Sequence, residues 1–183
     1  NERKRPYIVM EGMSDRFMAT YKRPFEAKDI NVVMYAGGLH ERYGLKKLTE
    51  AFLMLPQENF RLKLFGSGPF VEKLKTKYTK KDSRIQYMGV APNAEVVAAE
   101  LDASLLVNPR PTHEEFTKYS FPSKNIEYMA SGTPLLTTKL PGMPKEYYPY
   151  VFLIENESVE GYAKALESVL AQSDEELYVF GEK

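Results

Sequence analysis

The chain of 183 residues is 43% hydrophobic, which is enough to bury one sizeable core and permits one domain or slightly more. Its 25 Lys and Arg residues balance its 25 Asp and Glu residues, which argues against nucleic acid or an anionic membrane as a partner attracted by net charge. The absence of cysteine excludes a disulfide framework and a cysteine zinc site and is compatible with a cytoplasmic location, while no apolar run approaches the roughly 20 residues of a membrane span.

The first 29 residues predict a strand followed by a loose connection. Residues 7–10 form a short apolar run, and the polar stretch 14–29 contains Pro24. We therefore divide the chain into residues 1–29, a linker strand with its connection, and residues 30–183, one domain.

That domain contains six short apolar runs, each bounded by Gly, Pro, Asn or Asp, and these runs predict β-strands. They are residues 31–36, 60–65, 85–88, 103–107, 133–138 and 151–154. Apolar residues recur at helical spacing between them, as in Leu45, Leu48 and Phe52. Because strand and helix alternate, the sequence predicts an α/β fold with a Rossmann-like parallel sheet flanked by helices on both faces. Ligands of such sheets bind beyond the carboxyl ends of the strands.

Residues 119–134 give the strongest indication of a ligand site. Pro122 fits the first turn of a helix, so the free amides of the next residues, Ser123, Lys124 and Asn125, are able to bind an anion. Glu127 lies one turn beyond Ser123 and leans toward the same place, where its carboxylate suits a ribose hydroxyl beside a phosphate.

The alternative for this stretch is an ordinary amphipathic helix. In that interpretation Ile126, Met129 and Ala130 pack inward and Glu127 is solvated. Helical spacing alone favours this alternative.

From Phe121 onward the stretch follows the pattern F-P-S-K-x-x-E-Y-x-A-S-G-x-P, which resembles the signature of family 4 retaining glycosyltransferases of the GT-B fold. Other segments resemble that family in the same order along the chain: residues 32–39, 43–44, 48–52, 65–69, 85–90 and 101–109. The resemblance implies that residues 30–183 are the donor-nucleotide-binding half of a GT-B fold. Residues 1–29 would then be the linker from a missing N-terminal domain.

The resemblance also implies a function. The parent protein would move a sugar from a UDP-sugar or GDP-sugar, with retention, to a glycan, lipid-linked or other hydroxyl acceptor, as in polysaccharide biosynthesis. It would need no cofactor, and the missing domain would contact the acceptor, so the fragment alone would be inactive. A cytoplasmic location is expected, with a peripheral position at the cytoplasmic membrane face left open. A non-catalytic nucleotide or nucleotide-sugar binding module is the alternative function.

Two groups of residues are implied to contact the donor. The group at the donor sugar and phosphates consists of Gly37, Gly38, Tyr119, Ser120, Phe121, Pro122, Ser123 and Lys124. The group at the nucleoside consists of Gly66, Met88, Val90 and Glu127. For residues 88–90, a plain strand end is an equal alternative. No catalytic residue and no metal ligand is assigned, because neither histidine has the partner that a zinc helix requires.

Three positions depart from the family pattern. Relatives usually carry Arg at the position matching Gly38 and Lys at the position matching Tyr43, and these two cations neutralise the leaving diphosphate. Lys124 is the basic residue inside the signature and is predicted to replace them, with Arg42, Lys46 and Lys47 as further candidates and a solvated Lys124 as the alternative. Tyr119 replaces the first glutamate of the family's E-x7-E pair, which leaves the identity of the sugar open.

A dinucleotide site is not favoured. Gly66-Ser67-Gly68 follows a predicted strand, but Val71 occupies the third glycine position of the dinucleotide fingerprint. No Asp or Glu ends the next predicted strand to hold an adenosine ribose. The sequence therefore argues against NAD binding and against a sugar-nucleotide epimerase.

Overall fold

The computed structural model describes residues 12–14, 24–119 and 121–183. Within these residues, six strands form one parallel sheet in the order β3-β2-β1-β4-β5-β6. The strands are β1 (Asn31–Ala36), β2 (Phe60–Phe65), β3 (Ile85–Gly89), β4 (Leu105–Asn108), β5 (Leu135–Thr138) and β6 (Phe152–Ile154). The strand expected at residues 7–10 and the predicted site residue Ser120 lie outside the described residues.

The predicted bounds of β1 and β2 are confirmed, and the other strands differ from prediction by one or two residues at one end or, for β4, at both ends. The start of β5 has a simple physical reason. Pro134 lacks an N–H group and cannot donate to the ladder, so pairing begins at Leu135 rather than at Thr133.

Helices connect the strands. The α-helices are α1 (Leu45–Phe52), α2 (Phe70–Lys73), α3 (Thr79–Lys81), α4 (Asn93–Asp102), α5 (Ser123–Ala130), α6 (Val159–Leu170) and α7 (Asp174–Gly181). A π-helical turn, η3 (Leu74–Tyr78), joins α2 to α3, and short 3-10 helices occur at η2 (Glu41–Tyr43), η4 (Glu115–Lys118) and η5 (Lys145–Tyr150). No helix of the described segments is long and apolar enough to cross a membrane.

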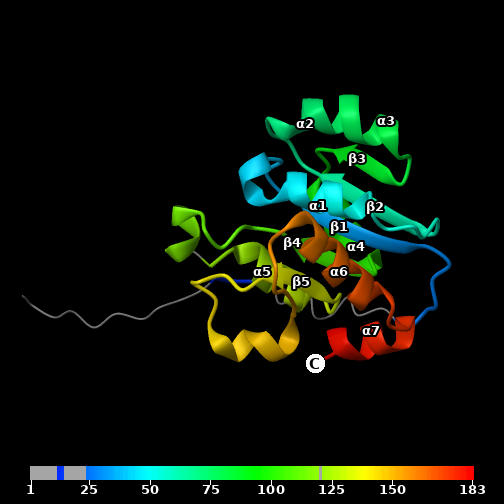
Figure 1. The fold of residues 1–183 in the computed structure, drawn as a ribbon. Coiled ribbons are helices and arrows are strands. Elements are labelled where there is room, and N and C mark those ends of the chain that lie inside the picture. The colour runs from blue at the N-terminus through cyan, green and yellow to red at the C-terminus, as the bar shows by residue number, and fades with distance from the viewer. Residues whose placement is uncertain (1–11, 15–23, 120) are drawn as a thin grey trace, which may run out of the picture.

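The sheet lies between two helical layers, as predicted (Figure 1). Alternate residues of β1 point to opposite faces, as the period of a strand requires. Val33 and Tyr35 belong to the core beneath α1 and α6, whereas Met34 and Ala36 belong to the core beneath α4 and α5. All four are buried, which makes β1 the centre of both cores.

The inner face of α5 differs from the amphipathic alternative. Asn125 and Tyr128 are its buried residues, and the apolar Ile126 is only half-buried. The Tyr128 hydroxyl accepts a hydrogen bond from the Ala36 amide at 2.9 Å, and the Asn125 Oδ1 accepts one from Asn108 Nδ2 at 2.5 Å. Polar side chains therefore fix α5 against the carboxyl ends of β1 and β4.

The side of the sheet on which the chain adds strands changes between β1 and β4. From β1 the chain moves outward through β2 and β3, and it then returns to the other side of β1 to build β4, β5 and β6. In open parallel sheets the loops at the carboxyl ends of the two central strands form a crevice at this reversal, and ligands bind there. These loops lie on the left in Figure 1, whereas the loops that lead into the strands lie on the right.

Candidate functional site

The loops at the carboxyl edge are bonded to one another through their backbones. The Gly37 amide donates to the Phe65 carbonyl at 3.1 Å, the Gly66 amide to the Gly89 carbonyl at 2.7 Å, and the Leu39 amide to the Ser67 carbonyl at 2.8 Å. The loops after β1, β2 and β3 thus form one connected rim, as the sequence predicts.

Gly66 is required by this packing. Its φ is +122°, and a Cβ atom there would lie 1.9 Å from the Gly37 carbonyl oxygen. Residues that carry a side chain rarely adopt that backbone conformation, and the contact with Gly37 leaves no space for a Cβ atom. Gly66, which the resemblance assigns to the nucleoside, is therefore required for a contact between two loops of the protein, and its contact with a nucleoside stays a prediction.

The start of α5 differs slightly from prediction. Pro122 lies outside the helix with ψ 122°, and the first helical residue is Ser123. The Asn125 amide donates to the Pro122 carbonyl at 2.9 Å, so it is not free for an anion. The predicted anion contact is reduced to the amides of Ser123 and Lys124. That these amides and the Gly37-Gly38 loop bind one phosphate stays a prediction.

Lys124 lies between two carboxylates. Its Nζ is 2.9 Å from Glu127 Oε2 and 3.6 Å from Glu100 Oε1. Glu100 is fully buried on α4, and burial raises the pKa of its carboxyl to about 7, against the opposing effect of the Lys124 charge. Lys124 is therefore partly neutralised before any ligand arrives, which makes it a weaker candidate for the phosphates than the sequence suggests.

The remaining predicted residues are accessible or lie against aromatic rings. The exposed fractions of Met88, Val90 and Tyr119 are 42%, 75% and 84%. The Phe121 ring stacks on Tyr147 with centroids 5.3 Å apart. Their contacts with a donor stay predictions.

The structure adds a cluster of cations and aromatic rings that the sequence analysis missed. The guanidinium carbon of Arg110 lies 4.9 Å from the Tyr43 ring centroid and 5.4 Å from that of Phe116. Arg42 lies 5.3 and 5.6 Å from the same two rings. A Cβ on Gly38 would lie 3.3 Å from Tyr43, so the cluster borders the loop after β1. The available signal was an arginine two residues after β4, a strand that ends at the ligand edge.

No metal centre is found in the described part of the chain, where no three His, Cys, Asp or Glu residues gather as metal ligands. His113 is exposed, and its Nδ1 lies 3.7 Å from Glu157 Oε2. Glu157 also accepts hydrogen bonds from the amide and hydroxyl of Thr112. This arrangement fixes the loop after β4.

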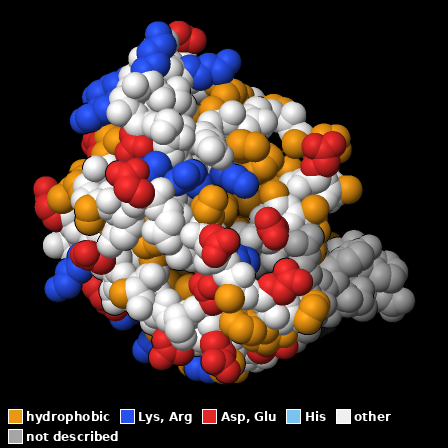
Figure 2. Space-filling model, turned by 90° about the vertical axis from the view of Figure 1, so that its right-hand side faces the viewer, with side chains coloured by type: hydrophobic (Ala, Val, Ile, Leu, Met, Phe, Trp, Pro, Cys, Tyr) orange, Lys and Arg blue, Asp and Glu red, His pale blue; other side chains and the backbone are white. Residues whose placement is uncertain are grey.

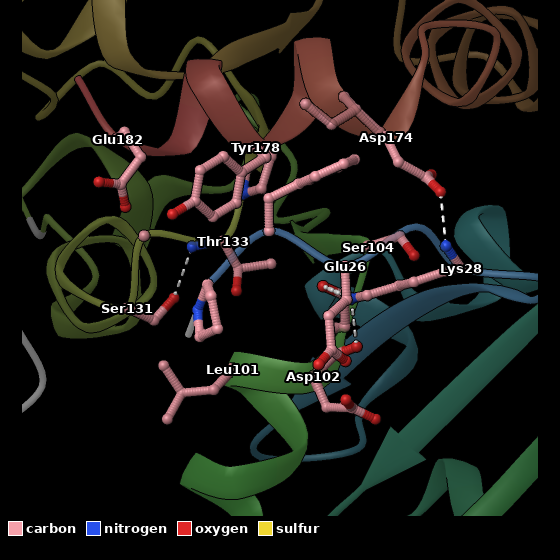
Figure 3. A pocket seen from close by; sticks show the side chains of 16 residues that line it. Glu26, Lys28, Leu101, Asp102, Ser104, Ser131, Thr133, Asp174, Tyr178 and Glu182 are labelled. Atoms are coloured by element: carbon pink, nitrogen blue, oxygen red, sulfur yellow. Dashed lines mark hydrogen bonds between the residues drawn. The ribbon is translucent and has the colours of Figure 1, made fainter. Parts of the chain in front are cut away.

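A small cavity at the opposite, amino edge of the sheet is a packing junction. Figure 2 views this side of the molecule, where side chains of both charges and hydrophobic side chains are mixed. The cavity measures about 110 Å³, below the 300–1,000 Å³ typical of ligand pockets. Two hydrogen bonds join residues that line it: the Lys28 amide donates to Asp174 Oδ2 at 2.7 Å, and the Thr133 amide donates to Ser131 Oγ at 3.1 Å (Figure 3).

Residues 19–182 match the family described as glycosyl transferases group 1. A curated relative from Escherichia coli (strain K12), named "Putative colanic acid biosynthesis glycosyltransferase WcaL", is 30% identical over 112 residues. The aligned region is 58% of this chain and 27% of the relative, so the chain matches about a quarter of that protein's length.

Solved structures share the fold. The C-terminal domain of LpcC, a glycosyl transferase group 1 family protein from Francisella tularensis, superposes with a TM-score of 0.67 at 18% identity, covering 93% of this chain and 89% of that one. Sucrose-phosphate synthase from Thermosynechococcus elongatus gives 0.68 at 22% identity, over 93% of this chain and 43% of that one. Anabaena HepE, solved in complex with UDP, gives 0.64 at 17% identity, over 84% and 42%.

The fold is therefore the Rossmann-like domain of GT-B glycosyltransferases. The chain belongs to the glycosyl transferases group 1 family.

Proposed function

We propose that residues 30–183 are the donor-binding half of a retaining glycosyltransferase that moves a sugar from a UDP-sugar or GDP-sugar to a glycan, lipid-linked or other hydroxyl acceptor. The observation that carries this proposal is the joining of the loops after β1, β2 and β3 at the edge of the sheet where α5 begins. WcaL, named for colanic acid biosynthesis, and HepE, solved with UDP, support a nucleotide-sugar donor.

In this proposal each segment contacts a different part of the donor. The amides of Ser123 and Lys124 bind a phosphate, because the start of a helix carries partial positive charge. The half-buried carboxylate of Glu127 accepts hydrogen bonds from the ribose hydroxyls. The exposed Met88 and Val90 cover the base.

The proposed chemical step is the one that the resemblance to retaining glycosyltransferases implies. The acceptor hydroxyl oxygen bonds to the anomeric carbon on the face from which the diphosphate departs, and a phosphate oxygen takes the hydroxyl proton. No carboxylate nucleophile is needed. The protein's contribution on this side is to hold the donor and to stabilise the charge that develops on the phosphate.

Thermal unfolding of the chain with UDP-, GDP- and ADP-sugars tests the donor assignment. A ligand at 100 times its Kd stabilises the folded state by about 2.7 kcal/mol. We expect a UDP-sugar or GDP-sugar to raise the melting temperature and an ADP-sugar to have less effect. The absence of any shift at millimolar concentrations contradicts the proposal.

A non-catalytic nucleotide-binding module is the second candidate, and the lack of basic residues at Gly38 and Tyr43 favours it. Turnover of nucleotide sugars by the full-length parent protein separates the two functions. Binding without release of nucleoside diphosphate, across a panel of hydroxyl acceptors, supports the module.

A further inference from the structure

Arg110 follows β4 at the point where the strand order reverses, and its backbone is fixed on both sides. The Pro109 carbonyl accepts a hydrogen bond from the Tyr162 hydroxyl at 2.8 Å, and the Arg110 carbonyl accepts one from Thr138 Oγ1. A side chain that begins from such an anchored backbone is well placed to present its charge at one position.

The guanidinium of Arg110 has aromatic neighbours and, in the part of the chain that the structure describes, no acidic partner. It lies beside Tyr43 and Phe116, with Arg42 near the same two rings. Among the described residues neither arginine forms an ion pair, and the buried Nε of Arg110 has no hydrogen-bond partner. Two neighbouring cations without a carboxylate between them attract an anion.

The cluster occupies the place where the family's usual cations are absent. Tyr35 donates a hydrogen bond to the Gly38 carbonyl at 3.1 Å, and the Arg110 charge opposes the burial that raises the pKa of Tyr35 to about 12. Arg110 and Gly38 also border the same Tyr43 ring, which places the Arg110 charge beside the loop after β1. The Tyr43 ring that replaces a lysine is also the ring beside which Arg110 lies.

We propose that Arg110, supported by Arg42, binds the diphosphate of the donor and replaces the two cations that positions 38 and 43 do not provide. In this proposal the loop after β4 supplies the positive charge that the loop after β1 lacks, and the two loops follow neighbouring strands of the sheet. A guanidinium binds phosphate oxygens through two parallel hydrogen bonds. This inference rests on the proposed donor-binding function.

Calorimetry with UDP and GDP, compared with uridine and guanosine, tests the assignment. Arg110→Gln should weaken binding of the preferred diphosphate about tenfold or more and leave the nucleoside affinity unchanged, because only the phosphates lose a partner. Arg61→Gln is the matched control: it removes the same charge from the start of β2, at the opposite edge, where Arg61 bonds the carbonyls of Glu58 and Phe60.

Diphosphate binding by Lys124→Gln tests whether Lys124, rather than Arg110, neutralises the diphosphate. Lys124 is already paired with Glu127 and Glu100, so its loss should weaken diphosphate binding less than the loss of Arg110. The reverse order, or equal losses for diphosphate and nucleoside in Arg110→Gln, overturns the inference.

Three further outcomes are decisive. If Arg110→Gln does not fold, Arg110→Lys replaces it in the test. Lysine keeps the charge but lacks the planar guanidinium that binds two phosphate oxygens at once, so this variant should bind the diphosphate several-fold more weakly. Wild-type affinity in Arg110→Lys overturns the inference. If the wild-type chain binds neither UDP nor GDP, the proposed function itself fails. Wild-type binding that Arg110→Gln leaves unchanged refutes only the role of Arg110.

Discussion

At the scale of single residues, Glu127 has two possible partners. Its carboxylate is bonded to Lys124 Nζ at 2.9 Å, and a bound ribose would add hydroxyl donors beside that pair. Because charged hydrogen bonds contribute about 1.5–3 kcal/mol, Glu127→Ala should weaken nucleoside and nucleoside diphosphate binding about tenfold or more. Calorimetry measures this, with Glu95→Ala, an exposed carboxylate on the first turn of α4, as control. Equal affinities in the two variants would remove Glu127 from the site.

Glu100 gives a prediction on pH. Burial raises the pKa of its carboxyl from 4.5 to about 7, so between these values the folded state binds more protons than the unfolded state. The contribution of Glu100 to stability is therefore full below pH 4.5 and declines as the pH rises through about 7. Glu100→Gln keeps the neutral form, so its stability should exceed that of the wild type by up to about 3 kcal/mol at pH 8 and match it near pH 4. Denaturant unfolding at both pH values tests this, and a constant difference between the proteins contradicts it.

At the scale of elements, the glycines at the ends of β2 and β3 are required for different physical reasons. Gly66 has positive φ and no space for a Cβ, whereas Gly89, at φ +78°, has no atom within 4 Å of one. Gly89→Ala should cost only backbone strain, about 1–3 kcal/mol, and Gly66→Ala should cost more, because it also displaces the Gly37 loop. Unfolding free energies of the two variants provide the comparison. Equal losses would mean that the loop contact contributes nothing.

Some of the strands and helices could be predicted from the sequence, and others could not. Strands are recognisable because buried parallel strands are short apolar runs between turn residues, and the bounds of β1 and β2 follow from that pattern. Helix α7 was missed although Ser173 and Glu176 form a capping box, a signal present in the sequence. The orientation of α5 was not predictable from apolar spacing, because buried Asn125 and Tyr128 are fixed by hydrogen bonds to distant strands.

At the scale of the whole molecule, the order of the strands determines where the site lies. The sequence indicated which loops share the carboxyl edge, since all strands of an alternating α/β chain point the same way. It did not indicate that β1 and β4 are neighbours, and so it did not bring Arg110 near Tyr43, 67 positions earlier in the chain. The pairing of Lys124 with buried Glu100 was not predictable either, because it also depends on which elements lie side by side.

The central claim is that a nucleoside diphosphate binds at the carboxyl edge, between the loops after β1 and β4. Backbone amide chemical shifts of the chain during titration with UDP or GDP test it most directly. We expect the largest changes at Gly37, Gly38, Ser123 and Lys124, and no comparable change at Gly132, which lines the amino-edge cavity. Changes centred on that cavity, or none at saturating nucleotide, would contradict the account.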